Sequence, residues 1–232
     1  MLCRARVRTS ADAATRRRRD DPLMTNPSPE PADSNNVPSE GLRQLRLGAL
    51  VDVAREHSGA DPYAWIQAST RQHRVEHGCR AYTFADGRQI QALAAAAKPR
   101  LVLELGTALG YTAACWASAG ARVDSVERDP QHVTLARANI ARAGFDDQVT
   151  IHEDDFQHAL RRLHGPYHVV FFDGNAPERE VLSALLQRLT HPGLLVVTNM
   201  QWAYREFLQW LTGQLGAQTR MIDEDLTLSA VL

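Results

Sequence analysis

Short apolar runs alternate with amphipathic stretches from Arg100 to the end of the chain. Apolar runs bounded by polar turns predict buried strands, and apolar residues at three- and four-residue spacing predict helices. The expected strands are Leu101–Leu105, Arg122–Val126, Val149–His152, His168–Phe172 and Leu194–Thr198. The expected helices between them are Thr112–Ala119, Pro130–Ala143, Phe156–Leu163 and Glu178–Leu189. This alternation is typical of a parallel sheet with helices on both faces.

The chain ends in a different pattern. A helix expected over Trp202–Leu211 precedes two strands, near Gln218–Ile222 and Leu226–Leu232. Only the short turn Asp223-Glu224-Asp225 separates these strands, which predicts a hairpin. The predicted fold class is therefore α/β, with a seven-stranded, mostly parallel sheet whose last strand is antiparallel.

The first part of the chain differs from the rest in composition. Residues 1–38 combine a run of arginines with five prolines and predict a disordered tail. That tail either binds an anionic partner or is merely solvated, and a start at Met24 would remove its arginines. Helical patterns follow from Glu40 to His77, with a break at Asp61-Pro62, and from Gly87 to Lys98. We expect a tail at 1–38, a helical N-terminal cap at 39–86 and the main domain at 87–232.

Composition narrows the class of protein. A chain of 232 residues with 44% apolar residues suits one sizeable globular domain. No apolar run approaches the roughly 20 residues that cross a bilayer, so we expect no membrane partner and a cytoplasmic location. Three scattered cysteines, Cys3, Cys79 and Cys115, argue against a disulfide framework and against a cysteine-based metal site.

Charge is distributed unevenly. Residues 1–23 hold seven Arg and three Asp, a balance of +4, which leaves 19 basic and 24 acidic residues, a balance of −5, on residues 24–232. A negatively charged body neutralises phosphates poorly, so we expect no nucleic-acid partner.

The segment LVLELGTALGY, residues 101–111, carries the sharpest functional signal. An apolar strand ends in Glu104, and Gly106 and Gly110 lie between it and a helix, where α/β sheets bind ligands. The G-x-x-x-G spacing differs from the G-x-G-x-x-G of pyrophosphate sites. An acid beside the glycines suits a ligand with an ammonium and a sulfonium group, as in S-adenosylmethionine. The alternative is a tight strand–helix turn in an unrelated α/β protein.

Four further strand ends carry polar residues. Glu127 follows the second strand and could accept hydrogen bonds from both ribose hydroxyls of S-adenosylmethionine or of a dinucleotide, or belong only to a helix start at Asp129-Pro130. Asp155, after the third strand, could bind an adenine amino group or form a solvated turn. Asp173 ends the fourth strand, and Thr198 with Asn199 ends the fifth. Together these positions predict one ligand-binding edge of the sheet.

Residues 87–232 resemble the catechol and caffeoyl-CoA type O-methyltransferases, which are class I S-adenosylmethionine-dependent enzymes with a Rossmann-like sheet. The resemblance rests on VLELGTALGY, SVERDP, VTIHEDDF, VVFFDGNAP and GLLVVTNMQW, in that order. It implies that Glu104, Gly106 and Tyr111 surround the methionine moiety of the cofactor, with Glu127 at the ribose, Asp155 at the adenine and Asp173 beside the transferred methyl. Thr107 and Gly110, in the same bend, are also expected to bind the cofactor.

The sequence departs from that family where its metal-dependent members bind a divalent cation. The family uses an aspartate after the fourth strand, matching Asp173, and an Asp-Asn pair, of which only Asn199 remains. Thr198 replaces the middle carboxylate, and Mg²⁺ prefers carboxylate and carbonyl oxygens. The family's lysine corresponds to Ala176, and Lys98, the only lysine, lies elsewhere. A Mg²⁺ site at Asp173 and Asn199 is therefore predicted to be weak or absent.

The expected reaction is methylation of a hydroxyl on a small molecule. Asp173 would act as the base or orient the acceptor hydroxyl. Trp202 and Tyr204 either line the acceptor pocket or pack as core. Three arginines, Arg71, Arg74 and Arg80, could serve an anionic acceptor. His73 and His77 have the spacing of a two-histidine metal face, but no third ligand is evident in the sequence, which favours an ordinary helix surface.

Two other functions fit the same pattern. A nicotinamide-dependent oxidoreductase shares the strand–glycine–acid layout. A catalytically inactive S-adenosylmethionine-binding sensor or interaction protein would explain the missing lysine and carboxylate. An apolar N-terminal helix is compatible with a homodimer. The identity of the acceptor does not follow from the sequence.

Overall fold

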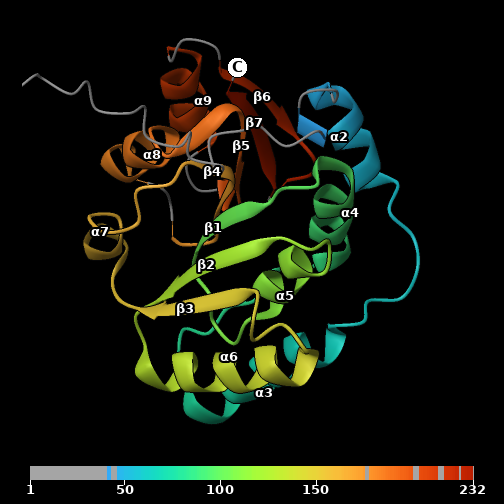
Figure 1. Cartoon of the computed structure of the whole chain (residues 1–232), viewed down its shortest axis with the longest axis vertical. Coiled ribbons are helices and arrows are strands. Elements are labelled where there is room, and N and C mark those ends of the chain that lie inside the picture. The colour runs from blue at the N-terminus through green and yellow to red at the C-terminus, as the bar shows by residue number, and fades with distance from the viewer. Residues whose placement is uncertain are drawn as a thin grey trace, which may run out of the picture. The chain divides into compact units, whose positions relative to one another are not determined.

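The computed structural model describes residues 41–42, 46–175, 178–200, 204–213, 217–224 and 226–231. Seven strands form one sheet in the order β3-β2-β1-β4-β5-β7-β6 (Figure 1). Pairs among β1 to β5 are parallel, and β7 is antiparallel to both β5 and β6. The strands are β1 Leu101–Leu105, β2 Arg122–Glu127, β3 Val149–Glu153, β4 Tyr167–Phe172, β5 Leu189–Val197, β6 Ala217–Met221 and β7 Thr227–Val231. The predicted mixed sheet with an antiparallel last strand is confirmed.

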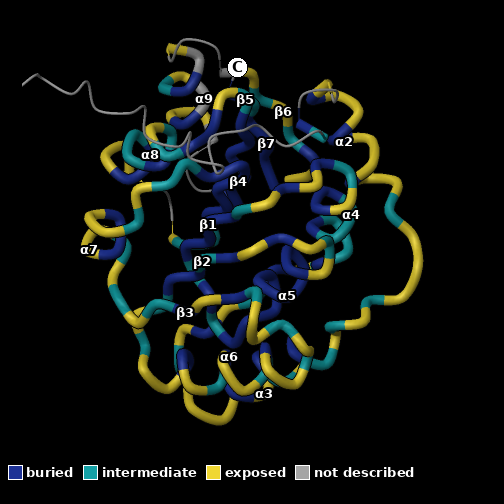
Figure 2. Tube along the Cα trace, in the orientation of Figure 1, coloured by how far each residue is buried: buried dark blue, intermediate teal, exposed yellow. Residues whose placement is uncertain are grey.

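Helices cover both faces of the sheet and form two separate apolar cores with it. One core draws on α2 Leu47–Arg55, α3 Ala64–His77, α4 Gly87–Ala97, α5 Tyr111–Ala117 and α6 Pro130–Ala143. The other draws on α7 Phe156–Ala159, α8 Arg179–Leu186 and α9 Tyr204–Thr212. The central strands are dark along most of their length in Figure 2, as expected for a doubly covered sheet.

The side chains of each central strand alternate between the two cores. On β4, Val169 and Phe171 belong to the first core, whereas Val170 and Phe172 belong to the second. All four are at most 3% exposed. Burial on both faces explains why these strands read as continuous apolar runs rather than as alternating apolar and polar residues.

Helix α6 has the bounds that the sequence predicts, because both of its ends carry strong local signals. The Asp129 carboxylate accepts hydrogen bonds from the backbone N–H groups of Gln131 and His132, and Pro130 opens the helix. Gly144 closes it with a left-handed backbone, φ +80°.

Three predicted boundaries after Arg100 are wrong by three or more residues. Strand β5 begins at Leu189 instead of Leu194, because Leu189 already pairs with Tyr167 before a register shift in the β4–β5 ladder. Helix α8 accordingly ends at Leu186. Helix α7 is a single turn that ends at Ala159. Beyond it, the guanidinium of Arg188 donates to the carbonyl oxygen of Leu163 at 2.7 Å.

Several predicted features lie outside the described residues. These are the tail at 1–38, Ala176, Trp202 and Asp225, and the side chain of Tyr204 is likewise not described. The domain boundaries at 38–39 and 86–87 remain predictions. Among the helices that the structure describes, none has the length and apolar character needed to cross a membrane.

Candidate functional site

The ends of the five parallel strands lie side by side at one edge of the sheet. Backbone hydrogen bonds just beyond the strands hold neighbouring ends together. Four of them run from Gly106 N to Val126 O (3.0 Å), Asp154 N to Glu127 O (2.9 Å), Asp173 N to Leu105 O (2.9 Å) and Thr198 N to Phe172 O (3.0 Å). The chain order reverses between β1 and β4, so this edge contains the switch point at which open α/β sheets bind ligands.

The bend after β1 depends on glycine at its first position. Gly106 has φ +104°, and a Cβ atom there would lie 2.5 Å from the carbonyl oxygen of Asp173. No larger side chain fits without moving the β4 end. Gly110, with φ +92°, starts helix α5. Ala108 also has a positive φ, 45°, which adds local strain to the bend.

Glu104 lies beneath the bend and not in the open cleft. It is fully buried. Its carboxyl group accepts a hydrogen bond from Thr112 Oγ1 at 2.5 Å and another from the Ser125 hydroxyl. Burial raises the pKa of Glu104 to about 8, against the lowering effect of these two hydrogen bonds. The acid that the sequence placed beside the glycines is therefore largely protonated at neutral pH.

Glu127 occupies a different environment at the end of β2. One carboxylate oxygen accepts a hydrogen bond from the backbone N–H of Ala108, at 2.9 Å. The other accepts from the N–H groups of Arg128 and Asp129, both at 3.0 Å. Its side chain is 13% exposed. Glu127 thus joins the glycine bend to the start of α6 while keeping an accessible edge.

Thr107 and Tyr111 anchor the bend on either side. Thr107 Oγ1 lies 2.5 Å from Ser125 Oγ, which extends the Glu104 network to the bend itself. The Tyr111 hydroxyl accepts from the backbone N–H of Gly87 at 2.9 Å and donates to the Asp61 carboxylate. Burial raises the pKa of the Tyr111 hydroxyl above its ordinary value. Tyr111 therefore connects the bend to the segments before β1 and does not supply a base.

Asp173, Thr198 and Asn199 come together at the ends of β4 and β5, as their strand positions predict. The Thr198 hydroxyl donates to Asp173 Oδ1 at 2.6 Å. The Asn199 side-chain amide donates to the carbonyl oxygen of Gly174 at 2.6 Å and lies 3.5 Å from Asp173 Oδ1. Thr198 is 1% exposed. The carboxylate is thus held by neutral hydrogen-bond donors.

This donor set does not fit a Mg²⁺ ion. Asp173 is the single carboxylate among the three side chains, and both neighbours direct hydrogen atoms, not lone pairs, at nearby oxygens. Mg²⁺ requires near-octahedral oxygen ligation and usually keeps carboxylate partners. The weak or absent Mg²⁺ site at Asp173 and Asn199 remains a prediction, and the chemistry of this donor set supports it.

Asp155 caps a helix in this structure. One of its carboxylate oxygens accepts a hydrogen bond from the backbone N–H of His158 at 2.8 Å, at the start of α7. The residue is exposed beside the end of β3. Its predicted contact with an adenine amino group remains a prediction, and the helix-cap role is compatible with it.

A narrow cleft of about 10 Å³ runs from the glycine bend to Asp173. Its second wall comes from residues that the sequence did not single out: Thr70, Tyr82, Thr83 and Phe84. The Thr83 hydroxyl is buried and has no hydrogen-bond partner among the described residues, so it can receive a polar ligand group. In the sequence, the available signal for this second wall was the polar segment just before Gly87. That this segment lies close to β1 depends on tertiary packing, which the sequence pattern does not show.

A larger cavity of about 360 Å³ lies elsewhere. It is bounded by α2 and by the early part of β5, at Pro192 to Leu194, with residues of β6 and β7. This is the opposite edge of the sheet from the strand ends, and none of the polar residues described above lines it. The strand-end cleft is therefore the candidate site despite its smaller volume.

The three arginines do not converge on the cleft. Arg71 and Arg80 are exposed. The Arg74 guanidinium lies over the ring of Tyr82, 4.6 Å from its centroid. Among the three, Arg74 contacts a residue of the cleft wall. That these arginines bind an anionic acceptor remains a prediction.

Known proteins match this arrangement. A family described as a methyltransferase domain matches residues 103–200, from β1 to the polar pair after β5. The O-methyltransferase TomG from Streptomyces achromogenes, involved in tomaymycin synthesis and solved in complex with SAM, superposes with a TM-score of 0.65. The superposition covers 83% of this chain and 99% of that one at 20% identity. The chain has the class I methyltransferase fold.

Two curated relatives extend the match in sequence. A catechol O-methyltransferase from Niastella koreensis is 33% identical over 120 residues, which are 49% of this chain and 54% of that protein. A putative O-methyltransferase from Mycobacterium sp. (strain KMS) is 28% identical over 208 residues, 83% of this chain and 90% of that protein. The chain thus spans about half the length of the first of these relatives. The predicted resemblance to O-methyltransferases is confirmed.

Proposed function

We propose that this protein transfers a methyl group from S-adenosylmethionine to a hydroxyl of a small molecule. The observation that carries the proposal is the strand-end constellation at the β1–β4 switch point. There Gly106 packs on Asp173, and Glu127 holds the same bend from the other side. The matches to O-methyltransferases support the reaction class.

The cofactor suits the residues of the strand-end site by its chemistry. Gly106 lets a ligand approach the backbone, and the Glu127 carboxylate can accept from two ribose hydroxyls. The unpartnered Thr83 hydroxyl lies in the wall opposite the bend. We place Thr107, Gly110 and Tyr111 around the methionine moiety, with Glu104 supporting the bend from below. A cleft of about 10 Å³ must widen before a nucleoside enters, which requires the Tyr82–Phe84 segment to move outward.

S-adenosylmethionine supplies an electrophilic methyl group. The protein's task is to orient the acceptor oxygen for in-line attack and to accept its proton. Asp173 is the proposed catalytic residue because it lines the cleft and because the resemblance to O-methyltransferases implies a position beside the transferred methyl group. The hydrogen bond from Thr198 Oγ1 fixes the orientation of that carboxylate. No step in this mechanism uses a divalent cation.

The remaining predictions rest on the sequence alone. A small-molecule acceptor agrees with the O-methyltransferase relatives. Cytoplasmic location, a homodimer and the lack of nucleic-acid or membrane partners stay proposals that composition and charge support.

The experiment is a methyl-transfer assay on the full chain with labelled S-adenosylmethionine, a panel of catechols and other phenols, and either Mg²⁺ or EDTA. We expect transfer to a phenol that persists in EDTA. The matched variant Asp173→Asn should lose turnover yet still bind S-adenosylhomocysteine. Transfer that requires Mg²⁺ would contradict the metal-independent mechanism. Cofactor binding without turnover on any acceptor would favour the inactive sensor.

A further inference from the structure

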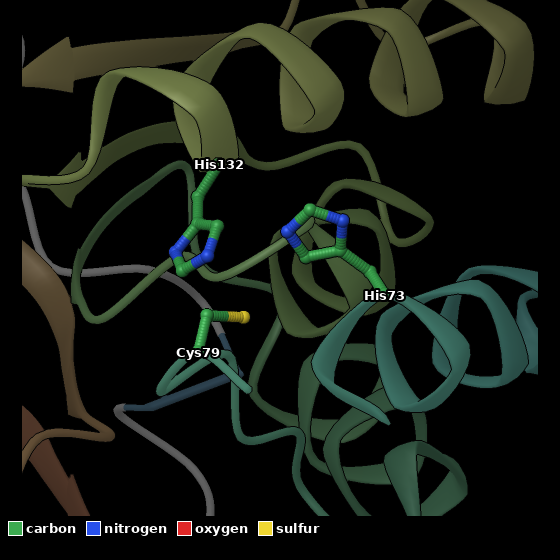
Figure 3. A group of neighbouring side chains, drawn as sticks. All are labelled: His73, Cys79 and His132. Carbon is green, nitrogen blue, oxygen red and sulfur yellow. The ribbon is translucent and has the colours of Figure 1, made fainter. Parts of the chain in front are cut away.

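His73, Cys79 and His132 gather at one point although they come from three separate segments. His73 lies in α3, Cys79 in the chain just after it, and His132 in the first turn of α6. One candidate ligand atom from each residue lies within 4.8 Å of the other two. Figure 3 shows the Cys79 thiol and both imidazole rings directed into the same space. The sequence favoured an ordinary helix surface for His73 and no cysteine-based metal site, so this cluster is a finding of the fold.

Local structure fixes the positions of the three side chains. Gly78 ends α3 in a left-handed conformation, φ +61°, and its N–H donates to the carbonyl oxygen of Arg74. That turn brings Cys79 back beside the helix. The Asp129 cap sets the start of α6 and so places His132. The rings of His73 and His132 then meet edge to face, with centroids 5.4 Å apart.

The cluster contains a buried polar atom that the protein does not satisfy. His73 is 8% exposed, and its Nε2 has no hydrogen-bond partner among the described residues. A buried, unpaired nitrogen is costly unless something else binds it. In Figure 3 the ring nitrogen of His73 farthest from its backbone points toward His132.

Acidic side chains surround the second imidazole. His132 Nδ1 lies 3.8 Å from Glu127 Oε1, and its Nε2 lies 4.0 Å from Asp129 Oδ2. A carboxylate beside a ligating imidazole orients the ring and strengthens its metal bond. These carboxylates also offset part of the charge of a bound cation. The cluster therefore has candidate ligands and the outer partners that metal sites use.

We propose that His73, Cys79 and His132 form a binding site for Zn²⁺ or a similarly soft divalent metal ion. Two imidazoles and one thiolate are typical zinc ligands and are poor ligands for Mg²⁺. Bond lengths of about 2.0 to 2.3 Å in a tetrahedral site place ligand atoms roughly 3.3 to 3.8 Å apart. Metal binding therefore requires side-chain rotations that bring the ligand atoms, now within 4.8 Å of one another, into that range. A fourth position stays open for water or for a carboxylate.

A bound metal would join the end of α3 to the start of α6. The chain after Cys79 continues to Tyr82, Thr83 and Phe84, which line the candidate cofactor cleft. The proposed metal site therefore supports one wall of that cleft and is separate from Asp173, Thr198 and Asn199. It does not depend on the proposed methyl transfer.

The test is titration of the tag-free full chain, stripped of metal, with Co²⁺ as a spectroscopic substitute for Zn²⁺. All proteins carry Cys3→Ser, which leaves Cys79 and Cys115 as the two thiols. We expect one equivalent of Co²⁺ to produce a thiolate-to-metal absorption band that Zn²⁺ abolishes and Mg²⁺ does not. Cys79→Ser should remove the band and weaken Zn²⁺ binding roughly tenfold or more in calorimetry.

Two controls separate the site from its neighbours. His77→Ala removes the exposed histidine whose ring lies 4.4 Å from that of His73, and it should leave binding unchanged. His73→Ala should weaken binding as strongly as Cys79→Ser, and circular dichroism of the metal-free variants reports whether each folds. No thiolate band in the folded parent protein, or equal Zn²⁺ affinity in the parent and a folded Cys79→Ser, would overturn the proposal.

Discussion

Glu104 and Glu127 flank the same glycine bend, yet the fold gives them opposite properties. Glu104 is fully buried, accepts hydrogen bonds from two hydroxyls and has a pKa raised to about 8. Glu127 is partly exposed and accepts hydrogen bonds from three backbone N–H groups. The resemblance implied that both carboxylates bind the cofactor, Glu104 near the methionine moiety and Glu127 at the ribose. In the structure Glu104 supports the bend from beneath, whereas Glu127 keeps an accessible edge for the ligand proposed above.

Changing the bend between the two carboxylates should have the largest effect. Gly106→Ala forces a Cβ atom to within 2.5 Å of the Asp173 carbonyl oxygen at φ +104°. We expect it to destabilise the fold by about 3 kcal/mol and to abolish cofactor binding. Urea denaturation and calorimetry measure the two effects.

Gly120→Ala is the matched control, because Gly120 has φ +86° and no atom lies within 4 Å of the place that the added methyl group would take. It should cost about 1 kcal/mol and leave binding intact. Equal losses in the two variants would mean that backbone conformation alone, and not the contact with Asp173, makes glycine necessary at the bend.

Removing Glu127 should weaken ligand binding most among the carboxylate variants. Glu127→Ala deletes the acceptor for the ribose hydroxyls, and hydrogen bonds to a charged group contribute roughly 1.5 to 3 kcal/mol. We expect a roughly ten- to hundredfold loss of affinity for S-adenosylhomocysteine, with a smaller loss in Glu127→Gln. Calorimetry measures the affinity of each variant for S-adenosylhomocysteine. A Glu104→Gln variant that loses more affinity than Glu127→Ala would contradict the roles assigned to the two carboxylates.

Glu104 should reveal itself through the pH dependence of stability. Its pKa is about 8 when folded and 4.5 when exposed, so the folded state binds more protons between these values. The free energy of unfolding should therefore fall as pH rises from about 5 to 8, by at most about 1.4 kcal/mol per pH unit. Glu104→Gln should flatten that part of the profile. An unchanged slope in denaturation series would show that Glu104 titrates normally.

A substitution beside Asp173, the third carboxylate of the candidate site, has the smallest expected effect. Thr198→Asp places a second negative charge beside Asp173, where a hydroxyl now donates at 2.6 Å. Without metal it should destabilise the protein by about 1 kcal/mol. Mg²⁺ should raise the melting temperature of this variant and not that of the parent. A parent protein that Mg²⁺ stabilises equally would contradict the argument from the donor set.

Local patterns predicted the features that depend on neighbouring residues. Strand β1 and helix α6 have the predicted bounds, because an uninterrupted apolar run and the Asp129-Pro130 cap specify them directly. The rule that the carboxyl ends of parallel strands meet at one edge of the sheet also predicted that Asp173, Thr198 and Asn199 lie together. Packing across the sheet buries Glu104 and places Thr83 in the cleft wall. Local sequence patterns do not predict either feature. Cys79 meets His132 only because α3 lies beside α6, which no local spacing encodes.

The most direct test of the account is calorimetric titration of the full chain with S-adenosylhomocysteine in EDTA. One site per chain is predicted, with binding lost or strongly weakened in Glu127→Ala and kept in Asp173→Asn. Absence of binding to the folded parent protein, or equal affinity in Glu127→Ala, would contradict the placement of the nucleoside at the β1–β2 edge.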